Sequence, residues 1–312
     1  MIIPRVIIHG GAGRALKSSE RAASVQAALY AVLDEIHQML VGGASAVDAV
    51  VHGCRLLEDD SNFNAGTGSV LQSDGQIRMS AALMDGERQC FSGVINVARV
   101  QNPIDLASVL QGGRDHVLSD LGAMELAREL NLPVYDPLIE RRLSEWLEQR
   151  GQDRAKPAAD VVGAGSEHGS GTIGVVAFDT HGRLAAGTST GGRGFERVGR
   201  VSDSAMPAGN YATQGAAISC TGIGEDIIDE CLAARISVRV DDGMSLHEAF
   251  ARSFAEASRR KRNFGAIGID ARGTIAWGKT SEILLAAYTD GQSRADTLGL
   301  ELGMLVESLP MA

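Results

Sequence analysis

The chain has 312 residues, which is long enough for one large domain. Acidic residues (39) outnumber Lys and Arg (29), and the resulting net charge of −10 argues against a nucleic acid or an anionic membrane as partner. Hydrophobic residues make up 44 % of the chain, enough for a sizeable core, while no apolar run reaches the roughly 18 residues of a membrane span. Glycine is frequent and aromatic residues are scarce, which indicates tight turns and backbone close to a ligand.

Four cysteines, Cys54, Cys90, Cys220 and Cys231, are too dispersed to predict a zinc site or a disulfide framework. We expect buried thiols in a reducing compartment. The apolar run at residues 1–8 is too short for a secretory signal, so the sequence predicts a cytoplasmic protein.

The first half of the chain begins with a buried strand at 6–8 that ends in a glycine turn. Ser18 or Ser19 is predicted to cap a long helix, and Ser45 a second helix that extends to Leu57, because a serine oxygen accepts the unpaired N–H groups of a first turn. A turn-rich stretch covers 60–73. The other elements predicted before residue 151 are strands near 77–84 and 91–97 and helices from Pro103, over 121–130 and, charged and exposed, over 141–150.

Residues 152–171 are rich in Gly, Ala, Ser and Asp and predict a mobile linker. Beyond it, Asp-Thr-His-Gly at 179–182 is typical of a hairpin between two strands. The elements predicted after the linker are strands over 172–178, 183–188, 212–220, 266–269, 274–277 and 282–287 and helices over 225–238 and 246–259. Strands and helices are segregated, which favours an α+β fold with antiparallel sheets between helix layers.

Thr172 is the most informative residue, because it begins a predicted strand directly after the linker and follows Gly171. A hydroxyl next to an unobstructed glycine can attack the preceding carbonyl. If that bond were cut, Thr172 would gain an α-amine with a pKa of about 7.7–8, which is able to take up the proton of its own hydroxyl. The alternative is an ordinary strand-initiating threonine.

Two further groups of residues suit substrate binding. The strand-to-helix turn at 219–225 offers backbone N–H groups for an oxyanion hole. Arg200 and Asp203 carry opposite charges three residues apart, which suits the carboxylate and the ammonium of an amino-acid substrate. A surface salt bridge between these two residues is the alternative.

Seven motifs in one order resemble the plant-type (class 2) L-asparaginase and isoaspartyl peptidase family of N-terminal nucleophile hydrolases. They are His-Gly-Gly-Ala-Gly at 9–13, Phe-Asn-Ala-Gly-Thr-Gly at 63–68, Met-Asp-Gly at 84–86, Gly-Thr-Ile-Gly at 171–174, Thr-Ser-Thr-Gly-Gly at 188–192, Gly-Arg-Val-Ser-Asp at 199–203 and the turn at 219–225. The resemblance extends from residue 5 to about residue 290 and implies a four-layer αββα sandwich in a single domain, 1–312. It also implies cleavage of a precursor between Gly171 and Thr172 into an α-chain (1–171, with the linker 152–171) and a β-chain (172–312).

The family likewise implies the role of each site residue. Thr172 would be the nucleophile, and Thr190 a second hydroxyl beside it. Asn64 would position the nucleophile, and Thr221 with Gly222 would form the oxyanion hole. Arg200 and Asp203 would bind substrate together with Thr221 and Gly222.

No organic cofactor is implied by the resemblance, but a structural sodium ion is, in a main-chain loop formed by Leu57, Glu58, Phe63, Ala65 and Thr67. The expected partners are small substrates, L-asparagine and β-aspartyl dipeptides, and a second copy of the cleaved αβ unit in a homodimer. The site would attack the β-aspartyl carbonyl through a threonyl ester.

Some segments differ from the family pattern, chiefly Arg-Arg-Lys-Arg at 259–262 and Lys-Thr-Ser-Glu-Ile at 279–283. We hypothesise that these changes alter the preference for the leaving amino acid, with β-aspartyl-Arg or β-aspartyl-Lys favoured through Glu282. A solvated helix end is the alternative explanation of 259–262.

Parts of the sequence also fit two other functions. Gly-Thr-Ser-Thr-Gly at 187–191 fits the nucleophile motif of a serine α/β-hydrolase, with Ser189 as the nucleophile, but no helix is predicted after Ser189. A binding module with a decayed site is disfavoured because none of the expected site residues is missing. Glycosylasparaginase activity is the alternative within the family.

Overall fold

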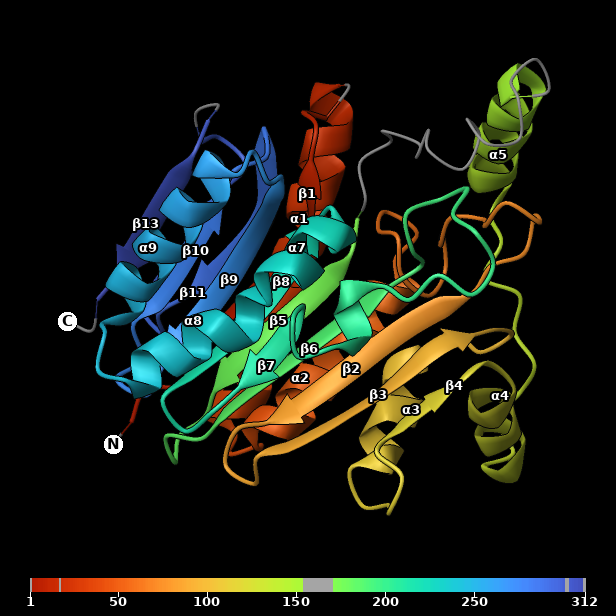
Figure 1. Ribbon diagram of the computed structural model, residues 1–312. Helices are drawn as coiled ribbons and strands as arrows, with labels where there is room; N and C mark the ends of the chain where they lie inside the picture. The colour runs from red at the N-terminus through yellow and green to blue at the C-terminus, as the bar shows by residue number, and fades with distance from the viewer. Residues whose placement is uncertain (1, 17, 154–170, 301–302, 311–312) are drawn as a thin grey trace.

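Two β-sheets form the centre of the molecule, and helices lie against them (Figure 1). The computed structural model describes residues 2–16, 18–153, 171–300 and 303–310. The linker predicted at 152–171 lies mostly outside these ranges, since residues 154–170 are not described.

The larger sheet has the strand order β12-β11-β1-β5-β6-β2-β3-β4. Its neighbours are antiparallel except for β3 and β4. The strands are β1 (Arg5–Gly13), β2 (Met79–Asp85), β3 (Cys90–Val97), β4 (Val117–Ser119), β5 (Ile173–Phe178), β6 (Leu184–Thr190), β11 (Ile283–Thr289) and β12 (Arg294–Asp296). The expected hairpin joins β5 to β6, and the Asp179 carboxylate accepts the N–H groups of His181 and Arg183 in its turn.

Helices cover one face of this sheet with a continuous apolar core. They are α1 (Ser19–Val41), α2 (Ala46–Asp59), α3 (Pro103–Leu110) and α4 (Asp120–Glu129). The side chains of Ser18 and Ser45 accept N–H groups of the first turns of α1 and α2, so both predicted caps are confirmed.

The smaller sheet has the order β13-β10-β9-β8-β7 and carries its own helices and core. Its strands are β7 (Asn210–Ala212), β8 (Ala216–Gly222), β9 (Phe264–Asp270), β10 (Ile275–Lys279) and β13 (Leu305–Leu309). Its helices are α7 (Gly224–Glu230), α8 (Leu232–Asp241) and α9 (Leu246–Arg259). Phe250 and Phe254 of α9 are fully buried over this sheet, and Phe254 meets Phe264 of β9 edge to face.

A third apolar cluster lies between the two sheets. Ile7 of β1 and Val176 of β5 belong to it, whereas their neighbours Ile8 and Val175 face the helices. Successive strand residues thus face opposite sides, and both faces are apolar because both are covered. The protein is therefore mixed α/β with two sheets and helices against each, as the segregated pattern predicted.

The predicted helix over 225–238 is wrong in one respect, because it is broken at Cys231, which adopts a left-handed conformation (φ 47°). The carbonyls of Pro207 and Ala208 accept the N–H groups of Ala234 and Ala233, so a distant loop supplies the partners that permit a second helix to start there. Cys231 is exposed, which corrects the expectation of four buried thiols.

Two other predictions need correction. The strand predicted over 212–220 is divided into β7 and β8 by a turn in which Thr213 Oγ1 accepts the N–H groups of Gly215 and Ala216. The helix predicted over 141–150 is α5 (Glu140–Asp153), but it is not uniformly exposed: Arg142 and Trp146 are buried.

Candidate active site

Thr172 lies immediately before β5, beside the end of β6, where Thr190 is the last residue. Both side chains are buried, and their hydroxyl oxygens are 3.0 Å apart. The N–H of Gly192 donates to Thr190 Oγ1 at 3.1 Å, which fixes the second hydroxyl in turn. The structure therefore brings the predicted nucleophile and its predicted neighbour into direct contact.

Asn64 holds the chain on both sides of this pair. Its backbone N–H donates to the carbonyl of Gly171 (2.9 Å), and its backbone carbonyl accepts the N–H of Gly191 (2.8 Å). Its side-chain amide donates to the carbonyl of Gly192 (2.7 Å) and accepts from Val70 N–H (2.9 Å). Asn64 is thus fully engaged in fixing the residues that flank Thr172 and Thr190.

His9 of β1 holds the carbonyl of Thr172 from the other side. Its Nδ1 lies 3.0 Å from that oxygen, which only accepts, so Nδ1 carries the proton. Complete burial lowers the pKa of His9 to about 3, and its ring is therefore neutral at neutral pH. Nε2 then accepts from the hydroxyl of Ser219 (2.9 Å), and Ser219 accepts from Thr188 (2.7 Å).

Gly174 explains why this buried chain of hydrogen bonds fits between the sheets. A Cβ atom on Gly174 would collide with Ser219 Oγ and His9 Nε2, so only glycine leaves room for them. Sequence reasoning named the 9–13 motif but missed Ser219 and Thr188 as its partners. Their presence in two of the seven motifs was the available signal.

Thr221 and Gly222 end strand β8, which packs against β1. Thr221 is buried, and its Oγ1 accepts the N–H of Ala12 in β1 at 3.2 Å. Gly222 has φ +135°, a conformation that strongly favours glycine, and leads into α7. The structure thus places both predicted oxyanion residues at the end of a strand that contacts the His9 strand.

Arg200 and Asp203 lie on either side of Gly224, where a Cβ atom would come within 2.6 Å of both side chains. Arg200 binds Glu225 through Nε (3.0 Å) and Nη2 (3.1 Å). The alternative of a simple Arg200–Asp203 salt bridge is therefore not what the structure shows. Glu225 was missed as a partner, although it closes the 219–225 motif.

Asp203 is a buried carboxyl group whose Oδ2 accepts no hydrogen bond among the described residues. Burial raises its pKa to about 7, against the opposing attraction of Arg200. An uncompensated buried carboxyl is costly, and a positively charged ligand group would relieve that cost. The site therefore suits an ammonium group next to a guanidinium.

In the loop expected to bind sodium, the main chains of Glu58 and Thr67 contact each other. Thr67 N–H donates to the carbonyl of Glu58 (2.7 Å), and Gly66 approaches that same carbonyl in a left-handed conformation (φ +53°). Leu57, Phe63 and Ala65 are buried within this turn. Burial raises the pKa of the Glu58 carboxyl well above its usual range, and its Oε1 accepts from Ile104 N–H. Two of the five residues expected to bind sodium, Glu58 and Thr67, therefore contact each other through their main chains.

The late departures from the family pattern have different surroundings. Arg260 pairs with Glu230, and Arg262 with Asp226 (2.9 Å), both of which belong to α7. This segment therefore contacts α7 through ion pairs and is not merely a solvated helix end. Glu282 is exposed and accepts Ala15 N–H at 3.0 Å, just beyond the end of β1.

Comparison with known proteins identifies the family. A family model described as Asparaginase matches residues 2–299. The chain is 59 % identical to an isoaspartyl peptidase/L-asparaginase of Nostoc sp. (98 % of each chain) and 56 % identical to one of Synechocystis sp. (96 % of this chain, 92 % of the relative). It is 35 % identical to a plant-type L-asparaginase of Pyrococcus horikoshii (91 % of this chain, 95 % of the relative). The chain belongs to the asparaginase family.

The rival serine nucleophile does not fit this asparaginase-family chain. Ser189 lies within β6. Gly187, two residues earlier in this strand, faces α2, whereas Thr188 faces the smaller sheet. By alternation Ser189 also faces α2, away from Thr172, and β6 runs on to Thr190 without a turn into a helix.

The helices in the described ranges are too short or too polar to cross a bilayer.

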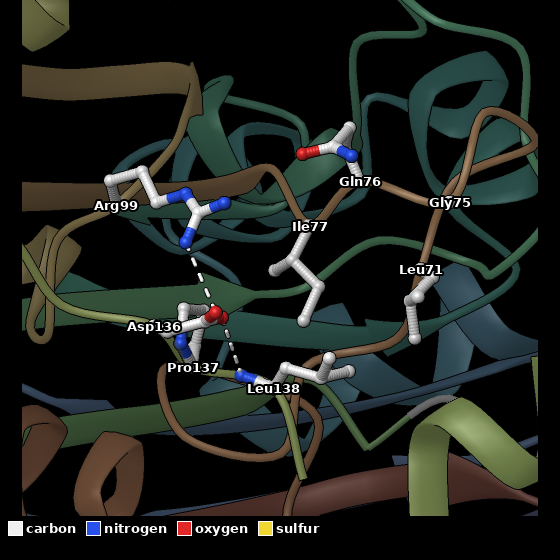
Figure 2. A pocket seen from close by; sticks show the side chains of 8 residues that line it. All are labelled: Leu71, Gly75, Gln76, Ile77, Arg99, Asp136, Pro137 and Leu138. Atoms are coloured by element: carbon white, nitrogen blue, oxygen red, sulfur yellow. Dashed lines mark hydrogen bonds and ion pairs between the residues drawn. The ribbon is translucent and has the colours of Figure 1, made fainter. Parts of the chain in front are cut away.

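A surface pocket lies apart from these residues (Figure 2). It is formed where the segment around Leu71–Ile77 faces Asp136, Pro137 and Leu138, with Arg99 paired to Asp136 at its edge. None of the predicted site residues lines it.

Asp203→Asn tests the buried carboxyl. Between pH 4 and 7 folded Asp203 keeps a proton that the unfolded chain releases, so wild-type stability falls relative to the variant as the pH rises through this window. The pH-dependent part of this difference is absent below pH 4 and approaches about 4 kcal/mol above pH 7. Thermal unfolding at pH 4, 6 and 8 measures it. Asp115→Asn, at an exposed position, serves as control; a constant difference at all three values would contradict the assignment.

Proposed function

We propose that this protein is an isoaspartyl peptidase with L-asparaginase activity, which hydrolyses β-aspartyl amides through an ester on Thr172. The names of the two relatives at 59 % and 56 % identity and the 3.0 Å pairing of Thr172 with Thr190 beside Gly171 support this proposal. Glycosylasparaginase activity and the serine-hydrolase mechanism have no such support.

Maturation begins with the Thr172 hydroxyl attacking the carbonyl carbon of Gly171. The peptide C–N bond breaks as a C–O ester bond forms, and the proton moves to the new α-amine of Thr172. Water then hydrolyses the ester to a Gly171 carboxylate and a free Thr172 hydroxyl. Asn64 N–H, which already donates to the Gly171 carbonyl, is placed to stabilise the negative charge on that oxygen. The products are the chains 1–171 and 172–312.

Turnover repeats this chemistry on the substrate. The α-amine of Thr172 takes the hydroxyl proton, the oxygen attacks the β-aspartyl carbonyl, and the oxyanion is stabilised at Thr221 and Gly222. The leaving amine or ammonia takes a proton and departs, and water hydrolyses the ester to aspartate. Arg200 binds the substrate α-carboxylate, and Asp203 accepts from its ammonium.

The four-layer arrangement of the fold, the dimeric assembly and the cellular location are part of the same proposal. The helices against the outer faces of two packed sheets support the αββα sandwich of N-terminal nucleophile hydrolases. Assembly as a homodimer of αβ units and a cytoplasmic location follow from the family resemblance and remain predictions.

The replacement Thr172→Ala is expected to leave one band of 32.7 kDa on a denaturing gel and to abolish β-aspartyl hydrolysis. The wild-type protein is expected to give two bands, in proportion to chains of 171 and 141 residues. Thr180→Ala, in the hairpin turn between β5 and β6, is the control and should mature normally. Full wild-type activity from an uncut chain would refute the mechanism.

We further propose a preference for basic leaving residues. Support comes from the exposed Glu282 carboxylate next to Ala15, because this segment adjoins the β1 end that contacts Thr221. A carboxylate there attracts a lysine or arginine side chain through solvent-screened charge, worth at most about 1 kcal/mol.

The wild-type enzyme is therefore expected to show a higher kcat/KM for β-aspartyl-Arg and β-aspartyl-Lys than for β-aspartyl-Leu. Glu282→Gln keeps the acceptor oxygen for Ala15 and removes the charge, so this ratio should fall about three- to fivefold. Rates on L-asparagine, which lacks the side chain, provide the control. Equal rates on all substrates would reject the preference.

We also propose a structural sodium ion in the 57–67 loop, held by main-chain carbonyls of Leu57, Glu58, Phe63, Ala65 and Thr67. The ion would stabilise the loop that carries Asn64. Replacing NaCl by choline chloride at equal ionic strength is expected to lower the unfolding temperature by at least about 2 °C, because a bound ion stabilises the folded state. An unchanged unfolding temperature would reject the ion.

A further inference from the structure

Helix α5 packs two buried side chains against the loop that carries Asn64. We call residues 60–73 the Asn64 loop and residues 135–146 the clamp segment. Arg142 and Trp146 of the clamp segment are each only 8 % exposed, although the helix as a whole is strongly charged. Burial of an arginine in a surface helix requires a specific partner.

That partner is the backbone of the Asn64 loop. Arg142 Nε donates to the carbonyl of Gly68 at 2.7 Å, and Trp146 Nε1 donates to the carbonyl of Gln72 at 2.9 Å. Arg142 also binds Glu145 (2.9 Å), which fixes the guanidinium orientation, while the Trp146 ring stacks on Phe195. Hydrogen bonds from a charged donor are stronger than neutral ones, so the Arg142 contact is the principal one.

Three further contacts join the same two segments. The hydroxyl of Tyr135 lies 2.8 Å from Thr67 Oγ1, and the carbonyl of Pro137 accepts Gly68 N–H at 2.9 Å. Arg141 donates to the carbonyl of Ser61 at 2.8 Å. Figure 2 shows Pro137 and Leu138 facing Leu71 and Ile77 across the adjoining pocket. The clamp segment thus binds the loop on both sides of Asn64.

The loop needs this support because it belongs to no helix or strand. Gly66 and Gly68 have positive φ angles, which the unfolded chain adopts among many others, so ordering them costs conformational entropy. Asn64 makes its four hydrogen bonds to residues 70, 171, 191 and 192 only while this loop conformation persists.

We propose that Arg142, with Trp146 and Tyr135, is a positioning residue for Asn64 and, through Asn64, for Thr172. The inference rests on the proposed function, since it assigns these residues to maturation and turnover at Thr172. The Arg200 guanidinium is held from outside the clamp, by the Glu225 carboxylate in the first turn of α7 (3.0 Å). Loosening the clamp therefore changes the chemical step and not substrate binding.

The decisive comparison is Arg142→Met against Arg142→Lys in the full-length chain. Methionine retains an apolar stem without a donor, whereas lysine retains a charged donor for the Gly68 carbonyl. For Arg142→Met we expect maturation at least tenfold slower on a denaturing gel and kcat on β-aspartyl-Leu at least tenfold lower, with KM within twofold. Arg142→Lys is expected to recover at least half of the wild-type kcat. Arg128→Ala, an exposed arginine on α4, should match wild type.

The proposal would be overturned if Arg142→Met matured and turned over at wild-type rates, or if it raised KM and left kcat unchanged. It would also be overturned if Arg142→Lys were as impaired as Arg142→Met. If Arg142→Met does not fold, Tyr135→Phe decides by the same readouts, with an expected threefold loss of kcat and no loss as the contrary result. An uncut or inactive wild-type protein would instead reject the proposed function, so the two failures are distinguishable.

Discussion

The site depends on the fixed position of Thr172 where the two sheets meet. His9 of one strand donates to its carbonyl, Asn64 binds the carbonyl before it, and Thr190 contacts its hydroxyl. These three contacts come from segments more than a hundred residues apart or from the adjacent strand, so the complete fold is needed to assemble them. Local sequence preferences alone would place a threonine after a glycine, but they would not orient its hydroxyl group.

Burial favours the neutral form of an ionisable group in both halves of the site. Around Thr172 it keeps His9 neutral, so the hydrogen-bonded side chains of His9, Ser219 and Thr188 carry no charge. Around Gly224 it raises the pKa of Asp203 next to a guanidinium that is already bound by Glu225. A zwitterion bound as we propose would meet the Arg200 guanidinium and the Asp203 carboxyl at its α-carbon, and uncharged groups at its scissile amide.

Much of the fold and the site follows from the sequence, because the helix caps, the hairpin turn and the apolar alternation are local signals. Thr172, Arg200, Asp203 and Thr221 stood out because glycine-rich motifs surround them. Sequence reasoning failed where the deciding partner is distant: Cys231 interrupts a helix because Pro207 and Ala208 supply carbonyls. Arg142 likewise looked like an ordinary surface charge, since no pattern reveals that the Gly68 carbonyl lies next to it.

The pairing of β1 has a consequence for the proposed cleavage before Thr172. This strand lies between β5 and β11, both of which follow residue 172. On the other side of β5 and β6, strand β2, which precedes residue 172, pairs with β6. Each proposed fragment therefore supplies strands between those of the other, and backbone cleavage would not release them. Once denatured and diluted, however, the two fragments must find each other by diffusion. The mature enzyme then regains its structure in a second-order reaction, whereas the continuous precursor folds at a rate independent of concentration.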